Sequence, residues 1–112
     1  MKKEYRVRKH QEFDRIIHAG KKLKTPHFIL YAEPSPEAEH VRIGLAISKS
    51  NGGAVQRVRE KRQVRAMLAR RNDYADRLNL IILIRPSFDP EAKKANEEEL
   101  NQALDAIKGN LN

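Results

Sequence analysis

The chain contains no cysteine among its 112 residues. Disulfides, thiolate metal sites and nucleophilic thiol chemistry are therefore excluded, and a cytoplasmic location fits such a chain. No apolar stretch approaches the roughly 18 residues that a membrane span needs. The basic residues 1–9 lead into His10-Gln11-Glu12 rather than into an apolar signal core, so we expect neither membrane insertion nor secretion.

Aromatic side chains are scarce, and catalytic motifs are missing. The chain has three phenylalanines and three tyrosines, and its four histidines show no recurrent metal-ligand spacing. It contains no Ser-His-Asp order, paired-carboxylate motif or phosphate-loop signature. We therefore expect no catalytic residue and no metal ligand on the chain itself.

Positive charge is what the chain has in excess. The net charge is +8, and the sequence pI is about 10.0. Residues 1–84 hold 19 basic and 9 acidic residues, whereas residues 85–112 hold 4 and 6. This balance favours a nucleic acid or an anionic membrane as partner, and it assigns the basic surface to the first three quarters of the chain.

One expected helix, from Ala54 to about Arg71, concentrates this charge. Arg57, Lys61 and Arg65 recur every four residues and form one stripe, about 12 Å long at 1.5 Å per residue. Arginine can bridge two phosphate oxygens with its planar fork. We interpret the helix as a phosphate-binding rod rather than as a solvated basic face. Its apolar residues form no clean stripe, so periodicity does not show how it packs.

Hydrophobic patterning predicts a single domain over residues 1–112, in the order helix, three strands, helix, strand, helix. Leu78–Ile84 is nearly all apolar, as expected of a central strand covered on both faces. A mixed sheet covered by helices, an α/β (α+β) two-layer sandwich, is the expected architecture. The other expected elements are a basic extended arm (1–8), helices (10–19 and 90–110) and strands (21–24, 28–32 and 41–48).

The few aromatic residues offer one further candidate feature. Phe28 and Tyr31 lie on the same expected strand at an odd spacing, so their rings point to opposite faces. One face serves the core, and the other can present a ring to an unstacked base.

Ala46-Ile47-Ser48-Lys49 and the following residues 52–65 resemble the signature of the bacterial ribonuclease P protein subunit. That family has a strand ending in Ser-Lys, a Gly-Asn-Ala-Val turn and an Arg-x-Arg-x-Lys-Arg-x-x-Arg helix. The resemblance continues through Tyr5-Arg6-Val7, Phe28–Tyr31 and Leu80–Pro86, and it covers essentially the whole chain.

The resemblance implies a ribonuclease P protein fold, similar to ribosomal protein S5 domain 2, in which a mixed four-stranded sheet contains a left-handed crossover. The general handedness rule would not predict that crossover. It also implies a protein cofactor of an endoribonuclease holoenzyme whose RNA subunit is catalytic and holds Mg²⁺. The holoenzyme removes the 5′ leader of precursor tRNA, and the chain is expected to be a monomer within it.

Position by position, the resemblance implies two groups of site residues and no catalytic or metal-binding residue on the protein. Those expected to contact the catalytic RNA are Lys49, Arg57, Arg59, Lys61, Arg62 and Arg65. Those expected to line the cleft for the single-stranded leader are Phe13, Ile17, Tyr31 and Ser48.

The chain departs from the family pattern at several positions. An asparagine of the helix motif is Val58, the turn asparagine is Gly53, a lysine is Ser50 and a first-helix aromatic is Ile17. Valine and glycine offer no side-chain oxygen to a hydrated Mg²⁺. Loss of the aromatic at Ile17 would weaken base stacking, whereas the charge stripe survives. We therefore expect RNA binding to persist better than leader discrimination or catalytic enhancement. An apolar helix position is Glu60, and a strand serine is Ala46.

Three other functions stay open from the sequence. A generic RNA-binding module, including a divergent or engineered chain with little ribonuclease P activity, would share the charge without preferring the catalytic RNA. A protein-only nuclease would need carboxylates converging on a metal, and Glu60, Asp73 and Asp76 lack such spacing. A drifted chain without activity would not bind RNA at low salt.

Overall fold

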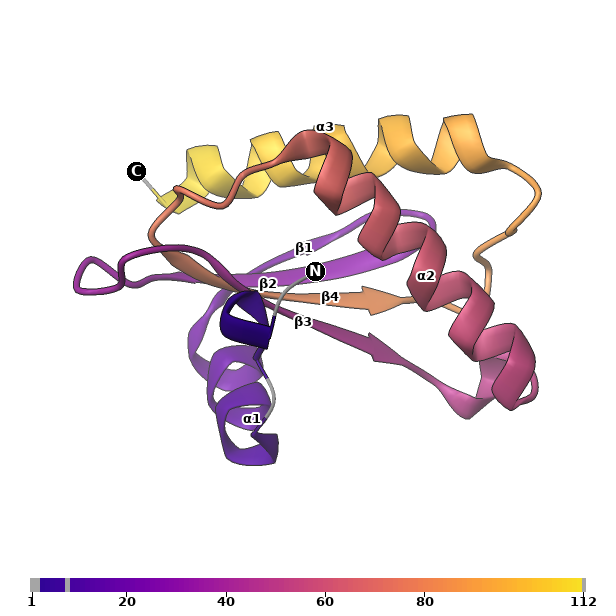
Figure 1. Ribbon diagram of the computed structural model, residues 1–112, viewed down its shortest axis with the longest axis horizontal. Coiled ribbons are helices and arrows are strands. Elements are labelled where there is room, and N and C mark those ends of the chain that lie inside the picture. The colour runs from indigo at the N-terminus through magenta and orange to yellow at the C-terminus, as the bar shows by residue number, and fades with distance from the viewer. Residues whose placement is uncertain (1–2, 8, 112) are drawn as a thin grey trace.

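The computed structural model describes residues 3–7 and 9–111, which form a four-stranded sheet and three α-helices (Figure 1). The order of elements confirms the predicted helix, three strands, helix, strand, helix. The bounds are α1 His10–Ala19, β1 Lys21–Lys24, β2 Phe28–Pro34, β3 Arg42–Ile47, α2 Ala54–Arg71, β4 Leu78–Ile84 and α3 Lys93–Leu111, with short 3-10 turns η1 Lys3–Tyr5 and η2 Lys49–Asn51.

The sheet is mixed, with the strand order β1-β2-β4-β3. β2 is antiparallel to both β1 and β4, whereas β3 is parallel to β4 and joined to it through α2. In Figure 1, β3 and β4 both run to the right, β4 lies above β3, and α2 crosses in front of the sheet. The β3–α2–β4 connection is therefore left-handed, as expected from the resemblance and against the general rule.

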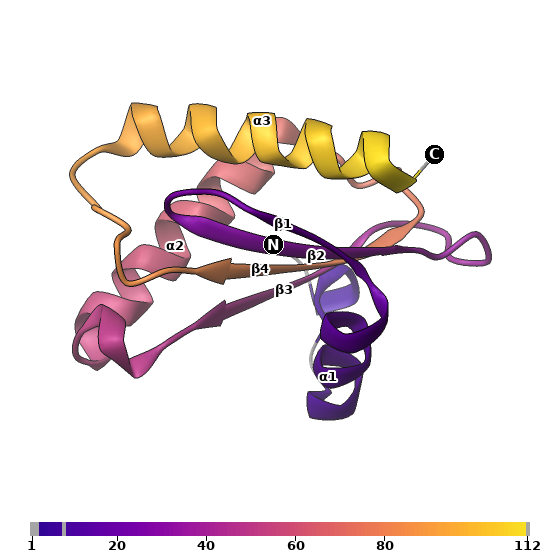
Figure 2. The ribbon, with the colours of Figure 1, turned by 180° about the vertical axis from the view of Figure 1, so that it is seen from behind.

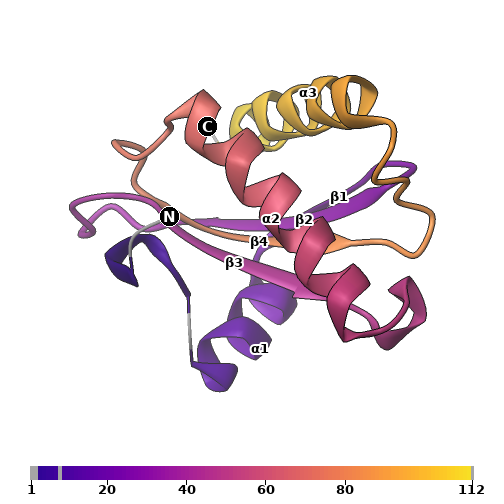
Figure 3. The same cartoon turned by 45° about the vertical axis from the view of Figure 1, so that its right-hand side comes forward.

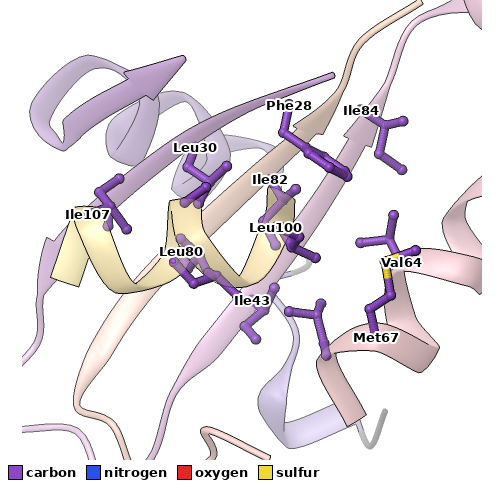
Figure 4. Close-up of a cluster of buried hydrophobic side chains, with 14 of the residues drawn as sticks. Phe28, Leu30, Ile43, Val64, Met67, Leu80, Ile82, Ile84, Leu100 and Ile107 are labelled. Carbon is purple, nitrogen blue, oxygen red and sulfur yellow. The ribbon is translucent and has the colours of Figure 1, made fainter. Parts of the chain in front are cut away.

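One face of the sheet carries the main core, which Figure 4 shows at close range. Alternate strand residues point toward α2 and α3, as the period of two in a strand requires. The helices contribute apolar residues that are almost completely buried. This core includes Phe28, Leu30, Ile43, Leu80, Ile82 and Ile84 from the strands, Val64 and Met67 from α2, and Leu100, Leu104 and Ile107 from α3.

The opposite face is covered by α1, which Figure 2 shows on the far side of the sheet from α3. Ile16 packs with Val7 and Ile81 in a second, smaller cluster. Gly44 makes this packing possible, because a Cβ at that position would lie 2.5 Å from Cζ of Phe13. The Phe13 ring thus lies directly against the backbone of β3.

The N-terminal arm differs from the extended segment predicted for residues 1–8. Residues 3–5 form the turn η1, Arg6 pairs with Ile43 in an isolated parallel bridge, and Val7 is buried. The Val7 amide donates a 3.0 Å hydrogen bond to the Ile43 carbonyl. The arm is therefore docked along β3, and residues 1–2 and 8 lie outside the described residues.

The last helix begins at Lys93 rather than at the predicted Pro90. Asp89 explains the shift, since its carbonyl accepts from Ala92 N and its side chain accepts from Glu91 N at 2.9 Å. These local bonds compete with the helix and delay its start. The other differences are one or two residues at the ends of β2 and β3 and one residue at the end of α3.

Glu99 ties α3 to the turn between β1 and β2. Its carboxylate accepts hydrogen bonds from Thr25 Oγ1 at 2.6 Å and from His27 N at 2.8 Å, and it lies 2.5 Å from His27 Nδ1. Burial by itself raises the pKa of Glu99, but the hydrogen bonds from His27 and Thr25 outweigh it and lower the pKa below its ordinary value.

We expect Glu99→Gln to remove a pH-dependent part of the stability. Because the folded pKa is lowered, the carboxylate stabilises the fold above about pH 4.3, its ordinary unfolded value, and this contribution disappears as the pH falls through the folded pKa. E99Q should therefore be about 1 kcal/mol less stable than wild type at pH 7. Urea unfolding between pH 7 and pH 3 should show the two chains converging at the acid end, and a constant difference would contradict the assignment.

Candidate nucleic-acid interface

Helix α2 uses one face for the core and leaves the basic stripe on a flank. Glu60, Val64, Met67 and Leu68 are buried against the sheet and α3. At about 100° per residue, Arg57, Lys61 and Arg65 lie beside this buried face, and all three are half-buried. The structure therefore groups the three predicted stripe residues on the side of α2 that faces β3 and the N-terminal arm.

Three other arginines of α2 form ion pairs with carboxylates of this chain. Arg59 pairs with Glu91 at 2.8 Å, Arg70 pairs with Glu97 at 2.6 Å, and Arg71 contacts both Asp73 and Asp105. These partners come from α3 or its approach, or from the turn after α2. Carboxylates of this chain thus neutralise part of the charge of α2 on the side toward α3.

The predicted RNA contacts are, with one exception, left without such partners. Arg59 is the exception, and its pair with Glu91 is exposed. Within residues 3–7 and 9–111, no salt bridge joins a carboxylate to Lys49, Arg57, Lys61, Arg62 or Arg65. The stripe is therefore a row of uncompensated cations.

The N-terminal arm adds a cation that the sequence did not assign to the site. Arg6 joins Lys61 and Arg65 around a cleft of about 230 Å³, whose apolar lining includes Phe13 and Leu45. Within residues 3–7 and 9–111, the buried Nε atoms of Arg6 and Arg65 have no hydrogen-bond partner. Unpaired buried donors are costly, so this cleft favours an anion.

Burial and, after it, mutual repulsion lower the pKa of two of these cations. Burial, followed by the charges of Arg6 and Arg62, lowers the pKa of Arg65. Burial, followed by the charges of Arg65 and Arg57, lowers the pKa of Lys61. A phosphate in the cleft would counter the lowering of both pKa values, because an opposite charge nearby favours the charged form of a side chain.

Three of the four predicted leader-cleft residues lie together on the α1 side of the sheet. Phe13, Ile17 and Tyr31 are partly buried around the cluster of Val7, Ile16 and Ile81. Lys22 Nζ lies 5.9 Å from the centre of the Tyr31 ring. The site thus combines aromatic rings with a nearby cation, as single-stranded RNA sites do.

The fourth residue, Ser48, lies apart from this cluster at the end of β3. Between them runs a row of paired, half-buried residues on the same face, Ala46, Leu83 and Ile29. Ser48 caps η2, accepting a 3.0 Å hydrogen bond from Ser50 N. Sequence reasoning did not single out Ile29 and Leu83, since alternation alone does not show which strand face a helix leaves open.

Glu60 holds the turn η2 against α2 and β4. Its carboxylate, 2% exposed, accepts from Asn51 Nδ2 at 3.0 Å and from Gln56 Nε2 at 2.7 Å. Asn51 Nδ2 also donates to the Arg85 carbonyl at 2.9 Å. The departure from an apolar residue at this position is therefore a polar clamp on the turn that carries Lys49, another role that the sequence did not reveal.

The described carboxylates and histidines do not form a metal centre. Nowhere in residues 3–7 and 9–111 do three or more such side chains converge in a way that could hold an ion. In the same part of the chain, no helix has the length and apolar character needed to cross a membrane.

Comparison with known proteins assigns this arrangement to a family. A model of the Ribonuclease P family matches residues 1–108. The chain belongs to the ribonuclease P protein family. The ribonuclease P protein component of Macrococcus caseolyticus is 31% identical over 107 residues, covering 96% of this chain and 90% of the relative. That of Exiguobacterium sibiricum is 37% identical over 99 residues, covering 88% and 83%.

Solved structures agree with the sequence relatives. A mutant of the Staphylococcus aureus ribonuclease P protein superposes with a TM-score of 0.86 at 26% identity, covering 95% of this chain and 90% of that one. The protein from Thermotoga maritima gives 0.75 at 25% identity, covering 92% and 94%. The fold predicted from the resemblance is thereby confirmed.

Membership of this family also establishes the role of the chain. It is the protein cofactor of ribonuclease P, the endoribonuclease that matures the 5′ ends of tRNA, and it associates with the RNA subunit in the holoenzyme. The ribonuclease P protein therefore has an RNA partner, for which the uncompensated flank of α2 is the candidate surface.

We expect Asn51→Ala to destabilise the protein by about 1–3 kcal/mol, because it leaves the buried Glu60 carboxylate short of a donor. The double variant N51A/E60L should recover much of this loss, since removing both polar partners is nearly neutral. Urea unfolding of the wild type, both single variants and the double variant measures the coupling. S50A, in the same exposed turn, is the control, and additive effects of N51A and E60L would refute the clamp.

Proposed function

We propose that the ribonuclease P protein binds the RNA subunit through the flank of α2 and holds the 5′ leader of precursor tRNA beside α1. The observation that carries this proposal is a set of cations without carboxylate partners among the described residues: Lys49, Arg57, Lys61, Arg62 and Arg65. Arg59 joins them with a part of its charge offset by Glu91.

Electrostatics supports RNA as the ligand of this flank. A self-repelling row of cations destabilises the free protein and is stabilised when a polyanion binds. Phosphate contacts release condensed counterions, which supplies much of the affinity of such surfaces. The buried Nε atoms of Arg57 and Arg65, which have no partner in the part of the chain that the structure describes, add donors that phosphate oxygens can satisfy.

Single-stranded RNA suits the surface next to α1. Phe13 and Tyr31 can stack on unpaired bases, and the row of Ala46, Leu83 and Ile29 continues this surface toward Ser48. The cations around the cleft of Arg6, Lys61 and Arg65 lie next to Phe13, so backbone phosphates of the same strand can be neutralised there. A leader running from α1 toward η2 would use both features.

The chemistry of cleavage then belongs to the RNA subunit. The resemblance implies that Mg²⁺ is held by that RNA. In keeping with this, Glu60 accepts hydrogen bonds from amides, and Glu91, Glu97 and Asp73 are paired with cations of this chain. The protein contributes by binding and positioning the RNA. It acts as a monomer within a cytoplasmic holoenzyme.

We expect the triple variant R57A/K61A/R65A to bind the RNA subunit at least several-fold more weakly. The slope of log affinity against log salt should also become shallower, by about 0.7–0.9 for each phosphate that the variant no longer neutralises. Filter binding between 50 and 400 mM salt would measure both quantities.

K24A/K94A, which removes two exposed cations of β1 and α3 that line neither proposed RNA-binding surface, is the charge control for this experiment. Competition with ribosomal RNA separates a cofactor from a generic RNA-binding module, which would show no preference for the RNA subunit. Unchanged affinity and slope in the triple variant would refute the proposed surface.

A second prediction concerns the leader. Ile17→Phe should increase the preference for precursor tRNA with a leader over mature tRNA, because a ring beside Phe13 and Tyr31 adds a stacking contact of roughly 1–3 kcal/mol per base. Ile17→Leu, similar in volume but without a ring, should leave the preference unchanged. Equal preferences for I17F and I17L in holoenzyme binding assays would place the leader elsewhere.

A further inference from the structure

The outer face of α2 exposes an apolar pair that the fold does not use. Val55 and Val58 are 86% and 46% exposed, and they are the two exposed large apolar residues in the described part of the chain. They lie three residues apart and therefore side by side on the helix surface. Val58 is also a position where the sequence departs from the asparagine of the family motif.

The two valines line a groove whose walls are held in place. The groove has a volume of about 660 Å³ and is also lined by Ala54, Arg59, Arg62, Gln63 and Lys93. Gln63 Nε2 donates to the Pro90 carbonyl at 3.1 Å, and Arg59 pairs with Glu91 at 2.8 Å. These bonds fix the segment before α3 beside α2, at the N-terminal half of the helix that Figure 3 shows crossing in front of the sheet.

Charge complementarity indicates what this groove accepts. Its rim carries Arg62 and Lys93, neither of which forms a salt bridge within residues 3–7 and 9–111, while Arg59 is offset by Glu91. An apolar floor with a cationic rim matches a nucleotide, whose base is flat and weakly polar on its face and whose phosphate is anionic. The groove is continuous with the proposed RNA-binding surface, because Arg59 and Arg62 belong to both.

We propose that an unpaired nucleotide of the RNA subunit docks in this groove, with its base on Val55 and Val58 and its phosphate between Arg62 and Lys93. This inference rests on the proposed function and adds a base contact to a surface otherwise made of phosphate contacts. Two valines offer far less apolar area than a stable protein–protein interface buries, which argues against a second copy of this chain as the occupant.

The test uses V55S/V58S, with A69S as the matched control on an exposed part of the same helix outside the groove. Affinity for the RNA subunit should fall about ten-fold, as expected when roughly one to two methylene equivalents lose their burial. The salt slope should stay at the wild-type value, because no phosphate contact is removed. A69S should bind like wild type.

Chemical probing of the RNA supplies an independent readout. One nucleotide protected by the wild-type protein and by A69S should become reactive with V55S/V58S. V55A/V58A, which introduces the strongest helix former, should give a smaller loss of affinity in the same direction and guards against an effect on folding.

The outcomes separate this inference from the proposed function. Wild-type affinity and protection with V55S/V58S, alongside weak binding by R57A/K61A/R65A, would overturn the groove and leave the proposed function standing. Wild-type binding by both variants would overturn both. A dimer in sedimentation without RNA that V55S/V58S abolishes would assign the groove to a second copy and also overturn the inference.

Discussion

The candidate RNA-binding site depends on one feature of α2: carboxylates of the described residues neutralise the basic side chains on one side of the helix and not those on the other. On the side of α2 that faces α3, Arg59, Arg70 and Arg71 meet carboxylates of this chain. On the flank that faces β3, Arg57, Lys61 and Arg65 meet none within the described residues. The same helix is thus bound to its own domain along one side, and along the other, where we propose that RNA binds, it carries cations unpaired among the described residues.

The two sides of α2 keep these different surroundings because packing and hydrogen bonds fix the position of the helix. Val64 and Met67 insert into the core between the sheet and α3. Glu60 connects the helix to η2 and, through Asn51, to the end of β4. A left-handed crossover then brings the cationic flank next to the N-terminal arm, where Arg6 completes the cleft with Lys61 and Arg65.

Much of the fold could be predicted from residue patterns. The bounds of α1, β1, α2 and β4 agree with the expected ranges, because Gly20, Pro86 and the run of apolar residues at 78–84 are strong local signals. The start of α3 was displaced by Asp89, whose side chain competes for backbone groups. The packing of α2 was unpredictable, since its buried face contains Glu60, a charged residue that period analysis counts as exposed.

The candidate site, like the fold, could be predicted from the sequence only in part. Residue identity and spacing were sufficient for the sign, density and helical alignment of the charge, because these depend on neighbours three and four positions apart. Only the folded structure shows which cations lack a carboxylate partner among the described residues. It also places Arg6 at the cleft and brings Val55 and Val58 into one groove with Lys93. Apart from the pair of Arg71 with Asp73, those contacts join residues 27 or more positions apart. Their distances are set by the packing of the helices and strands, on which local spacing carries no information.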